Sequence, residues 1–396
     1  MSRAQLVIAV YLPTTLLALG QGLLLTTLPL YAADFGVSYR LVGVAVAAAA
    51  LGTLVTDVPA GALLGRLGLR TTMIGGAGLV AVSTLALVFA QSLTEMIAYR
   101  VVAGIGTALW GLSRHAYIAE AVPAAQRGRA ISVFGGINRI GVLGGPAIGA
   151  FVGARFGLTA SFLLAGVAAT LALVVSVLWL APVARHGPAT RFGTRWQIVG
   201  RLVRTNGRDL AAASVAQTFA QMIRAGRHFI IPIYGADALG LDVDTIGLIM
   251  TASATVDVLM FVPAGMLMDR FGRKVAAVPS FAVMAVGVAL IPAADTALGL
   301  WVAALVIGFG NGLGSGTMMT LGADLSPPGA TGEFLGVWRL IGDAGAVGGP
   351  LVVGAMATGL GLRASALVLA GVGVVATLTL ALLVRETRVS PLDPTA

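Results

Sequence analysis

Long, nearly continuous apolar runs dominate this chain, and polar residues are confined to the stretches between them. A helix that crosses the hydrocarbon core of a bilayer needs about 20 such residues. Twelve segments meet that length, and they cover residues 6–31, 41–64, 71–91, 96–119, 130–153, 158–181, 210–234, 245–268, 275–293, 298–322, 334–358 and 364–384. Because the runs are continuous rather than alternating, they predict membrane-spanning helices and not the strands of a barrel.

One longer polar connection divides the twelve segments into two sets of six. The sequence therefore predicts an N-terminal six-helix bundle over 1–181, a cytoplasmic linker over 182–209, and a C-terminal six-helix bundle with a short tail over 210–396. In the linker, Trp196, Val199 and Val203 recur at helical spacing, with arginines on the other faces. This pattern favours an amphipathic helix on the membrane surface. An unstructured basic tether is the alternative.

The two halves match each other at a constant offset of 204 residues. Val-Pro-Ala-Gly ends at Gly61 and again at Gly265, and Gly-Gly-Pro ends at Pro146 and again at Pro350. Such a repeat predicts two parallel bundles related by an axis along the membrane normal, an arrangement that places a substrate site between the halves. Trivial repetition of glycine-rich helices is the alternative, but the matched prolines argue against it.

Composition narrows the possible functions. Only 10% of the 396 residues are charged, against about 25% in an average soluble protein. The absence of cysteine excludes disulfides, zinc ribbons, iron–sulfur clusters and cysteine nucleophiles. Lys274 is the only lysine and does not belong to a phosphate-binding loop, which argues against ATP hydrolysis. Three scattered histidines and no hydrolase motif predict no metal site, no cofactor and no enzyme activity.

The net charge of +9 is distributed unevenly among the loops. On one side of the twelve segments the loops and ends hold sixteen Lys and Arg, whereas the other side holds Arg40, Arg155 and Arg363. The positive-inside rule then predicts a multi-pass protein of the cell membrane with both termini in the cytoplasm. This distribution accounts for the basic composition without nucleic acid as a partner.

Two loops carry related motifs that resemble the signature loop of the major facilitator superfamily, G-x-L-x-D-R-x-G-R-K. The loop between segments eight and nine matches it closely, and the residues are Gly265, Asp269, Arg270, Gly272, Arg273 and Lys274. The first-half copy keeps Gly61, Arg66, Gly68 and Arg70 but has Gly65 in place of the acid. Glycines here allow close helix approach and a tight turn, and Asp269 can cap a helix or pair with an arginine. The resemblance implies gate loops, with the ionic latch of the first half in doubt.

Two helix motifs add to this resemblance, which covers nearly the whole chain. Arg100, Gly104 and Gly106 resemble the family's R-x-x-x-G-x-G, whose arginine is implicated in proton coupling. A second motif resembles the antiporter element G-x-x-x-G-P-x-x-G, and it comprises Gly141, Gly145, Pro146 and Gly149. The second half repeats it with Gly349 and Pro350. Both an exporter signature and simple helix packing are consistent with this motif.

Ionisable residues inside the spans are costly and mark candidate functional positions. The candidates for proton coupling or for the central cavity are Asp57, Arg100, Arg139, Asp257, Asp343, Arg224, Arg227, His228 and Asn138. Arg139 and Asp343 occupy equivalent depths under the repeat, so we expect them to face each other, as a static pair or in coupling. Burial favours the protonated form of Asp257 and Asp57; for Asp57, pairing with a loop arginine is the alternative. Arg224, Arg227 and His228 share one helical face and either line a cavity or pair with acids.

These features, with the resemblance to twelve-helix drug:proton antiporters, imply a secondary active transporter that works by alternating access. The implied partners are a small amphipathic substrate, protons as coupling ion and membrane lipids, with a monomer as the assembly. Because arginines outnumber acids inside the spans, we expect a cavity that tolerates neutral or anionic molecules. An importer or uniporter of a small organic, even anionic, solute is the alternative. A membrane sensor without transport is a more distant one.

Overall fold

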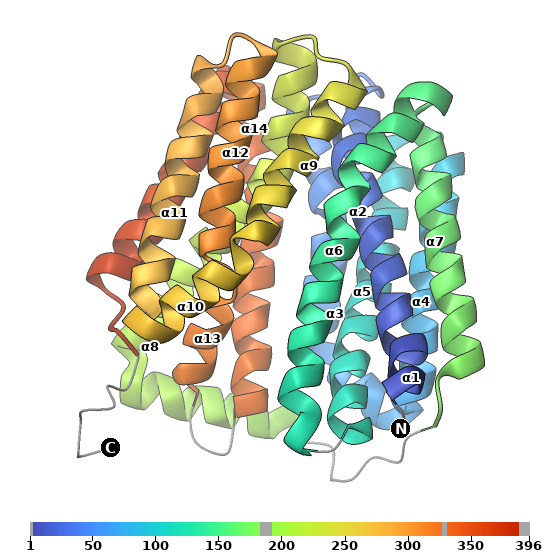
Figure 1. Ribbon diagram of the computed structural model, residues 1–396, viewed down its shortest axis with the longest axis vertical. Coiled ribbons are helices and arrows are strands. Elements are labelled where there is room, and N and C mark those ends of the chain that lie inside the picture. Colours follow the sequence, from blue (N-terminus) through green and yellow to red (C-terminus); the bar gives the residue numbers. More distant parts are fainter. Residues whose placement is uncertain (1–2, 123, 183–191, 327–330, 388–396) are drawn as a thin grey trace.

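The computed structural model describes residues 3–122, 124–182, 192–326 and 331–387, and within these ranges the chain is helical and contains no strand (Figure 1). The first half begins with α1 (Arg3–Leu6) and the π-helical turn η1 (Val7–Tyr11). Its main helices are α2 (Leu12–Ala33), α3 (Tyr39–Leu67), α4 (Leu69–Ala86) with the short η2 (Leu87–Phe89), α5 (Leu93–Ala121), α6 (Ala124–Phe156) and α7 (Leu158–Trp179).

The second half follows the same plan. Its elements are α8 (Phe192–Ile233), η3 (Tyr234–Ala238), α9 (Val243–Leu259), α10 (Phe261–Phe271), α11 (Arg273–Leu290), η4 (Ile291–Ala293), α12 (Ala297–Leu313), α13 (Thr317–Asp324) and α14 (Thr331–Leu382). Helix α14 is two helices joined at Gly361, whose φ of +84° breaks the helical path. Part of the predicted linker, residues 183–191, lies outside the described residues; α8 begins just after it and continues into the seventh span.

The described residues form twelve spans, as the apolar pattern predicts. Nine helical stretches of the described residues are long and apolar enough to cross a membrane. The longest of them, Phe334–Leu382, contains two spans because of the break at Gly361. The apolar part of α6, Gly141–Phe156, and the second part of α8 complete the set. Helices α9 and α10 together form one span, and so do α12 and α13.

The two halves stand side by side, and the described chain begins and ends at the same end of the bundle, here called the termini end (Figure 1). Towards the opposite end the halves touch through glycines. Gly43 of α3 meets the backbone of Pro350 in α14, and Gly247 of α9 meets Ala150 of α6. Close to these contacts, the hydroxyl of Tyr39 donates a hydrogen bond of 2.9 Å to Asp237. The protein is therefore closed at the end remote from its termini.

The repeat of 204 residues is visible in helix contacts. Arg70 at the start of α4 donates a hydrogen bond of 3.1 Å to the carbonyl of Val177 in α7. Lys274 at the start of α11 donates one of 2.7 Å to the carbonyl of Ala381 in α14. Both the donors and the acceptors of these two bonds are 204 residues apart. The sequence repeat thus corresponds to a repeated contact between equivalent helices.

Both copies of the glycine–proline motif serve helix packing. Gly145 of α6 lies against Gly22 of α2, and Gly149 lies against the carbonyl of Leu23. In the second half Gly349 of α14 lies against Met222 and Gly226 of α8 in the same way. A side chain at any of these glycines would collide with backbone atoms, so the motif lets the helix backbones touch.

The signature loops form tight turns at the termini end. Gly68 and Gly272 have φ of +79° and +107°, a conformation that glycine adopts without strain. The sequence-based expectation of close helix approach at Gly265 is wrong, because a Cβ added there would have no described atom within 4 Å. Arg273 pairs with Asp324 at 2.7 Å. Arg66 at the end of α3 and Asp269 and Arg270 at the end of α10 are exposed.

Candidate functional site

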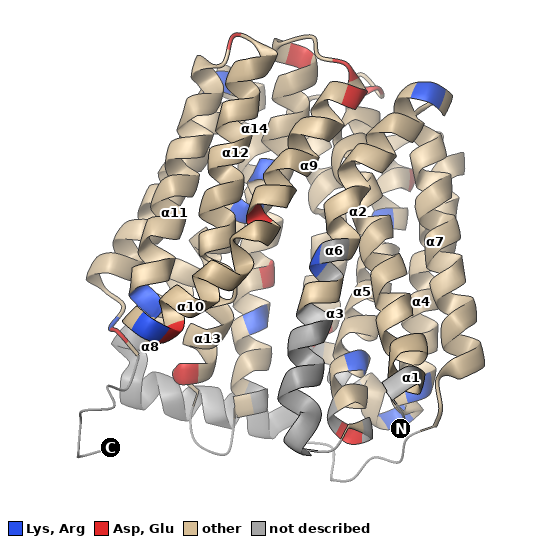
Figure 2. Ribbon diagram, viewed as in Figure 1, with Lys and Arg blue, Asp and Glu red and all other residues tan. Residues whose placement is uncertain are grey.

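Charged residues are concentrated at the helix ends, and a smaller group lies at mid-height between the two halves (Figure 2). The central member of this group is Asp257 of α9. Arg139 of α6 donates a hydrogen bond of 3.0 Å to its Oδ1. Asn311 of α12 donates one of 2.6 Å to its Oδ2, and Arg227 of α8 lies 3.9 Å from the same oxygen. Four helices from both halves therefore meet at one carboxylate.

The expected pair of Arg139 and Asp343 does not form. Arg139 points to Asp257 instead and also lies 4.8 Å from the centre of the Phe261 ring. Asp343 pairs at 3.3 Å with Arg339, which is four residues earlier on α14 and on the same helix face. The intrahelical neighbour is always within reach, whereas a partner on the other half depends on how the halves are turned.

Arg339 joins a second acid from the other half of the chain. Its Nη2 lies 3.6 Å from Oδ1 of Asp57 in α3. The alternative that Asp57 pairs with a loop arginine is therefore wrong, because Arg339 lies within a span. The spacing of Arg339 and Asp343 by four residues was the available signal for this cluster. Asn311 of the Asp257 cluster offered no comparable signal.

The three basic residues on one face of α8 have separate roles. Arg227 lies 3.9 Å from Asp257. Arg224 donates a hydrogen bond of 3.0 Å to the carbonyl of Gly314 and lies 5.0 Å from the centre of the Phe281 ring. His228 lines a cavity, and its Nδ1 is buried without a hydrogen-bond partner in the described part of the chain. The side chain of Asn138 lies outside the described residues.

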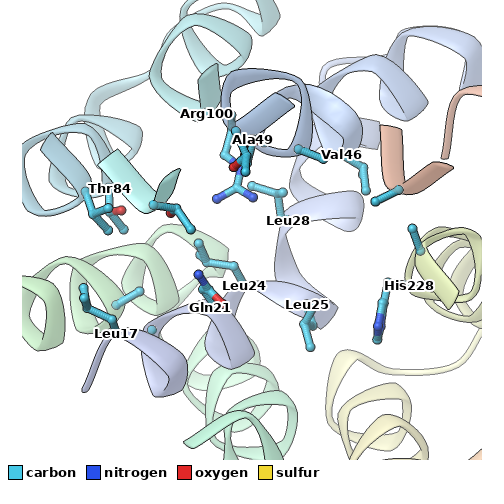
Figure 3. Close-up of a pocket in the computed structure, with 18 of the residues that line it drawn as sticks. Leu17, Gln21, Leu24, Leu25, Leu28, Val46, Ala49, Thr84, Arg100 and His228 are labelled. Carbon is cyan, nitrogen blue, oxygen red and sulfur yellow. Dashed lines mark hydrogen bonds between the residues drawn. The ribbon is translucent and has the colours of Figure 1, made fainter. Parts of the chain in front are cut away.

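Two cavities adjoin these residues. The larger, of about 300 Å³, extends from α2, α3, α4 and α5 to α8 and α14 of the other half. Figure 3 shows Arg100 and Gln21 among the side chains around it, with His228 on the far wall. The smaller, of about 260 Å³, contains Arg139, Arg227 and Asp257 in its wall. Leu25 and His228 line both, so the cavities are neighbours.

The two cavities offer apolar surface and charged side chains to a small solute. In the described ranges, no group of three or more His, Asp and Glu side chains is placed to hold a metal ion. The apolar walls suit an apolar solute, and the arginines suit a negative charge.

Comparisons with known proteins agree with this architecture. The family model described as Major Facilitator Superfamily matches residues 10–223 and 213–396. The uncharacterized MFS-type transporter MJ1560 of Methanocaldococcus jannaschii is 21% identical over 90% of this chain and 92% of its own. The quinolone resistance protein NorA of Staphylococcus aureus (strain MRSA252) is 28% identical over 43% of this chain and 44% of its own.

Solved structures show the same fold. The nucleoside transporter NupG has a TM-score of 0.80 at 14% identity and covers 96% of this chain and 100% of its own. A D-xylose-proton symporter has a TM-score of 0.76 at 19% identity, with 97% and 98% covered. Since the family model matches both halves and the twelve spans are present, the chain belongs to the major facilitator superfamily and is a membrane transporter rather than an enzyme.

Proposed function

We propose that this protein is a secondary active transporter that exports small amphipathic molecules in exchange for protons, by alternating access of a central cavity. The observation that carries the proposal is the position of Asp257. Its carboxylate is held by Arg139 from the first half and by Arg227 and Asn311 from the second half. The charge of one titratable group therefore contributes to the contact between the two moving parts.

Protonation of Asp257 would weaken that contact. The ionised carboxylate attracts both arginines, whereas the neutral acid leaves Arg139 without a charged partner among the described residues of the second half. The free energy difference between the two arrangements of the halves then depends on the proton, which is the requirement for coupling. Because the smaller cavity around Asp257 adjoins the larger one, a bound solute and the proton act on neighbouring groups.

Two features support export. NorA, a relative over 43% of the chain, is named for quinolone resistance. The glycine–proline motif on α6 resembles the antiporter element, although its repetition on α14 also serves packing. The excess of basic residues in the loops of the termini end supports a cytoplasmic location for this end in the cell membrane. The state closed at the opposite end would then be open to the cytoplasm.

The test is transport in proteoliposomes with norfloxacin, a fluorescent quinolone, as the probe. We expect an imposed proton gradient to drive norfloxacin movement against its own gradient. Asp257→Asn should abolish the gradient-driven component and retain norfloxacin counterflow, because exchange without net proton movement needs no titratable group. Asp242→Asn removes an exposed acid at the start of α9 and is the matched control.

Two results would contradict the proposal. The first is full gradient-driven transport by Asp257→Asn, which would remove this residue from coupling. The second is the absence of norfloxacin flux in the wild-type protein under gradients of either direction. Accumulation of norfloxacin by intact cells that make the protein, instead of exclusion, would favour the importer.

A further inference from the structure

Arg100 is a half-buried cation for which the described residues provide no counter-charge. It lies on α5, and its guanidinium projects into the larger cavity beside Ala49 and Leu28 (Figure 3). Its Nε is buried and has no hydrogen-bond partner, and none of the acids in the described ranges forms an ion pair with it. A charge removed from water is costly unless an opposite charge and hydrogen bonds compensate it.

The other residues that line the cavity around Arg100 do not supply a negative charge either. No acid lines this cavity within the described part of the chain. Besides Arg100, its walls are mainly apolar, with Gln21, His228 and three threonines as polar groups. Two of these threonines, Thr53 and Thr107, stand 204 residues before Asp257 and Asn311. The second half thus has an acid and an amide where the first half has two hydroxyls. Arg100 itself has Ala304 as its counterpart.

The residues in the cavity wall indicate which kind of ligand would complement Arg100. We propose that the larger cavity binds the carboxylate of an amphipathic organic acid, with Arg100 as the counter-charge and the leucines of α2 around the apolar body. This inference rests on the proposed function and names the substrate class of its central cavity. A guanidinium presents paired N–H donors that match the two oxygens of a carboxylate, and it is more weakly hydrated than an ammonium group. A cavity of about 300 Å³ suits an acid with one or two rings and is too small for a diacyl lipid.

The test compares three molecules that share one ring system and differ in charge. They are 2-naphthoate, neutral 2-naphthamide and cationic 2-naphthylmethylamine, and binding to the purified full chain in detergent is measured by equilibrium dialysis without a proton gradient. We expect naphthoate to bind about ten- to a hundredfold more tightly than naphthamide, because charge-assisted hydrogen bonds contribute a free energy of this size. The amine should bind most weakly.

Variants assign this preference to Arg100. Arg100→Gln should lower naphthoate affinity to that of naphthamide and leave naphthamide unchanged. Arg155→Gln removes an exposed arginine at the end of α6 and should change neither. Val46→Trp keeps Arg100 but fills the cavity beside it, and it should weaken both ligands. Val46→Trp therefore provides a test even if Arg100→Gln fails to fold.

Several outcomes would overturn the inference. These are undetectable binding of naphthoate, equal affinity of the wild type for naphthoate and naphthamide, a preference retained by Arg100→Gln, and full naphthoate binding by Val46→Trp. Since dialysis requires no gradient, an anion preference can be found even if Asp257 proves irrelevant to transport. Conversely, the protein can transport norfloxacin with a proton gradient even if it shows no preference for naphthoate over naphthamide. The two proposals can therefore fail separately.

Discussion

The contact between α2 and α6 gives a prediction whose size follows from the structure. Gly145 of α6 lies against the backbone of Gly22 and Leu23 in α2. A Cβ at Gly145 would lie 2.7 Å from the amide nitrogen of Leu23, whereas ordinary van der Waals contact begins at 3.4 Å. Because the obstacle is backbone, no side-chain rotation relieves it. The two helices must separate locally by more than the difference of 0.7 Å, since backbone atoms of Gly22 lie nearer to the added Cβ than the Leu23 nitrogen does.

The substitution Gly145→Ala therefore has opposing contributions. Alanine in place of glycine inside a helix stabilises by about 0.5–1 kcal/mol. Overpacking of a close contact costs about 1–3 kcal/mol. We expect a net loss of stability, seen as a lower thermal unfolding midpoint of the purified protein in detergent, followed by tryptophan fluorescence.

The matched control is Gly371→Ala. Gly371 is also inside a helix, α14, but nothing lies within 4 Å of its added Cβ. This variant should unfold at the wild-type temperature or above it. Gly349→Ala, the repeat-related change, should behave like Gly145→Ala, because Gly226 approaches it in the same way. A Gly145→Ala protein as stable as Gly371→Ala would refute the argument that backbone contact requires glycine here.

Three further predictions concern charges. Arg339 contacts both Asp57 and Asp343, so each of the single variants Asp57→Asn and Asp343→Asn should lower stability by only about 1 kcal/mol or less. In a double-mutant cycle, the double variant should lose more stability than the sum of the two single losses. Additive losses would disprove the shared partner. The carboxylate of Glu386 accepts the backbone N–H groups of Arg273 and Lys274 at the start of α11, so Glu386→Gln should lower stability by about 0.5–2 kcal/mol in thermal unfolding; an unchanged midpoint would speak against this cap. Burial, and then the charge of Asp237, raises the pKa of Asp34 above its usual value. An acid that binds its proton more tightly in the folded state stabilises the fold as pH falls towards that pKa, so Asp34→Asn should raise the unfolding midpoint at pH 7 and reduce its dependence on pH; a lower midpoint at pH 7 would contradict the sign.

The spans were predictable because the bilayer sets their length. Each of the twelve apolar segments corresponds to a helix, and the differences lie at the ends. Helix α6, for example, begins at Ala124 rather than near residue 130, because its first turns carry polar residues that no apolar pattern detects. The packing glycines were equally accessible to prediction, since spacing by four residues places them on one helix face.

The ion pairs were less predictable, because the repeat specifies depth but not rotation about the helix axis. Arg139 and Asp343 lie at equivalent depths, yet each has a nearer partner. The charged residues also break the repeat that the glycines obey. Asp257 and Arg100 correspond to Thr53 and Ala304, so no internal comparison could show which charges meet. Such asymmetry is expected at a site where one half binds differently from the other.

The two interfaces between the halves are built alike, and this arrangement bears on how the protein moves. In the α3–α14 interface, the Gly43 contact lies near the closed end. Asp57 follows fourteen residues later on α3, which corresponds to about 21 Å along the helix. The α6–α9 interface has the Gly247 contact and, ten residues or about 15 Å along α9, Asp257. Opening the closed end must part both glycine contacts, which involve no interlocked long side chains. The ion pairs lie nearer the centre, where rocking displaces atoms least. A change of charge at Asp57 or at Asp257 therefore alters the restraint near the pivot of the interface that contains that acid. In the proton exchange that we propose, protonation of Asp257 would act close to the pivot rather than at the closed end.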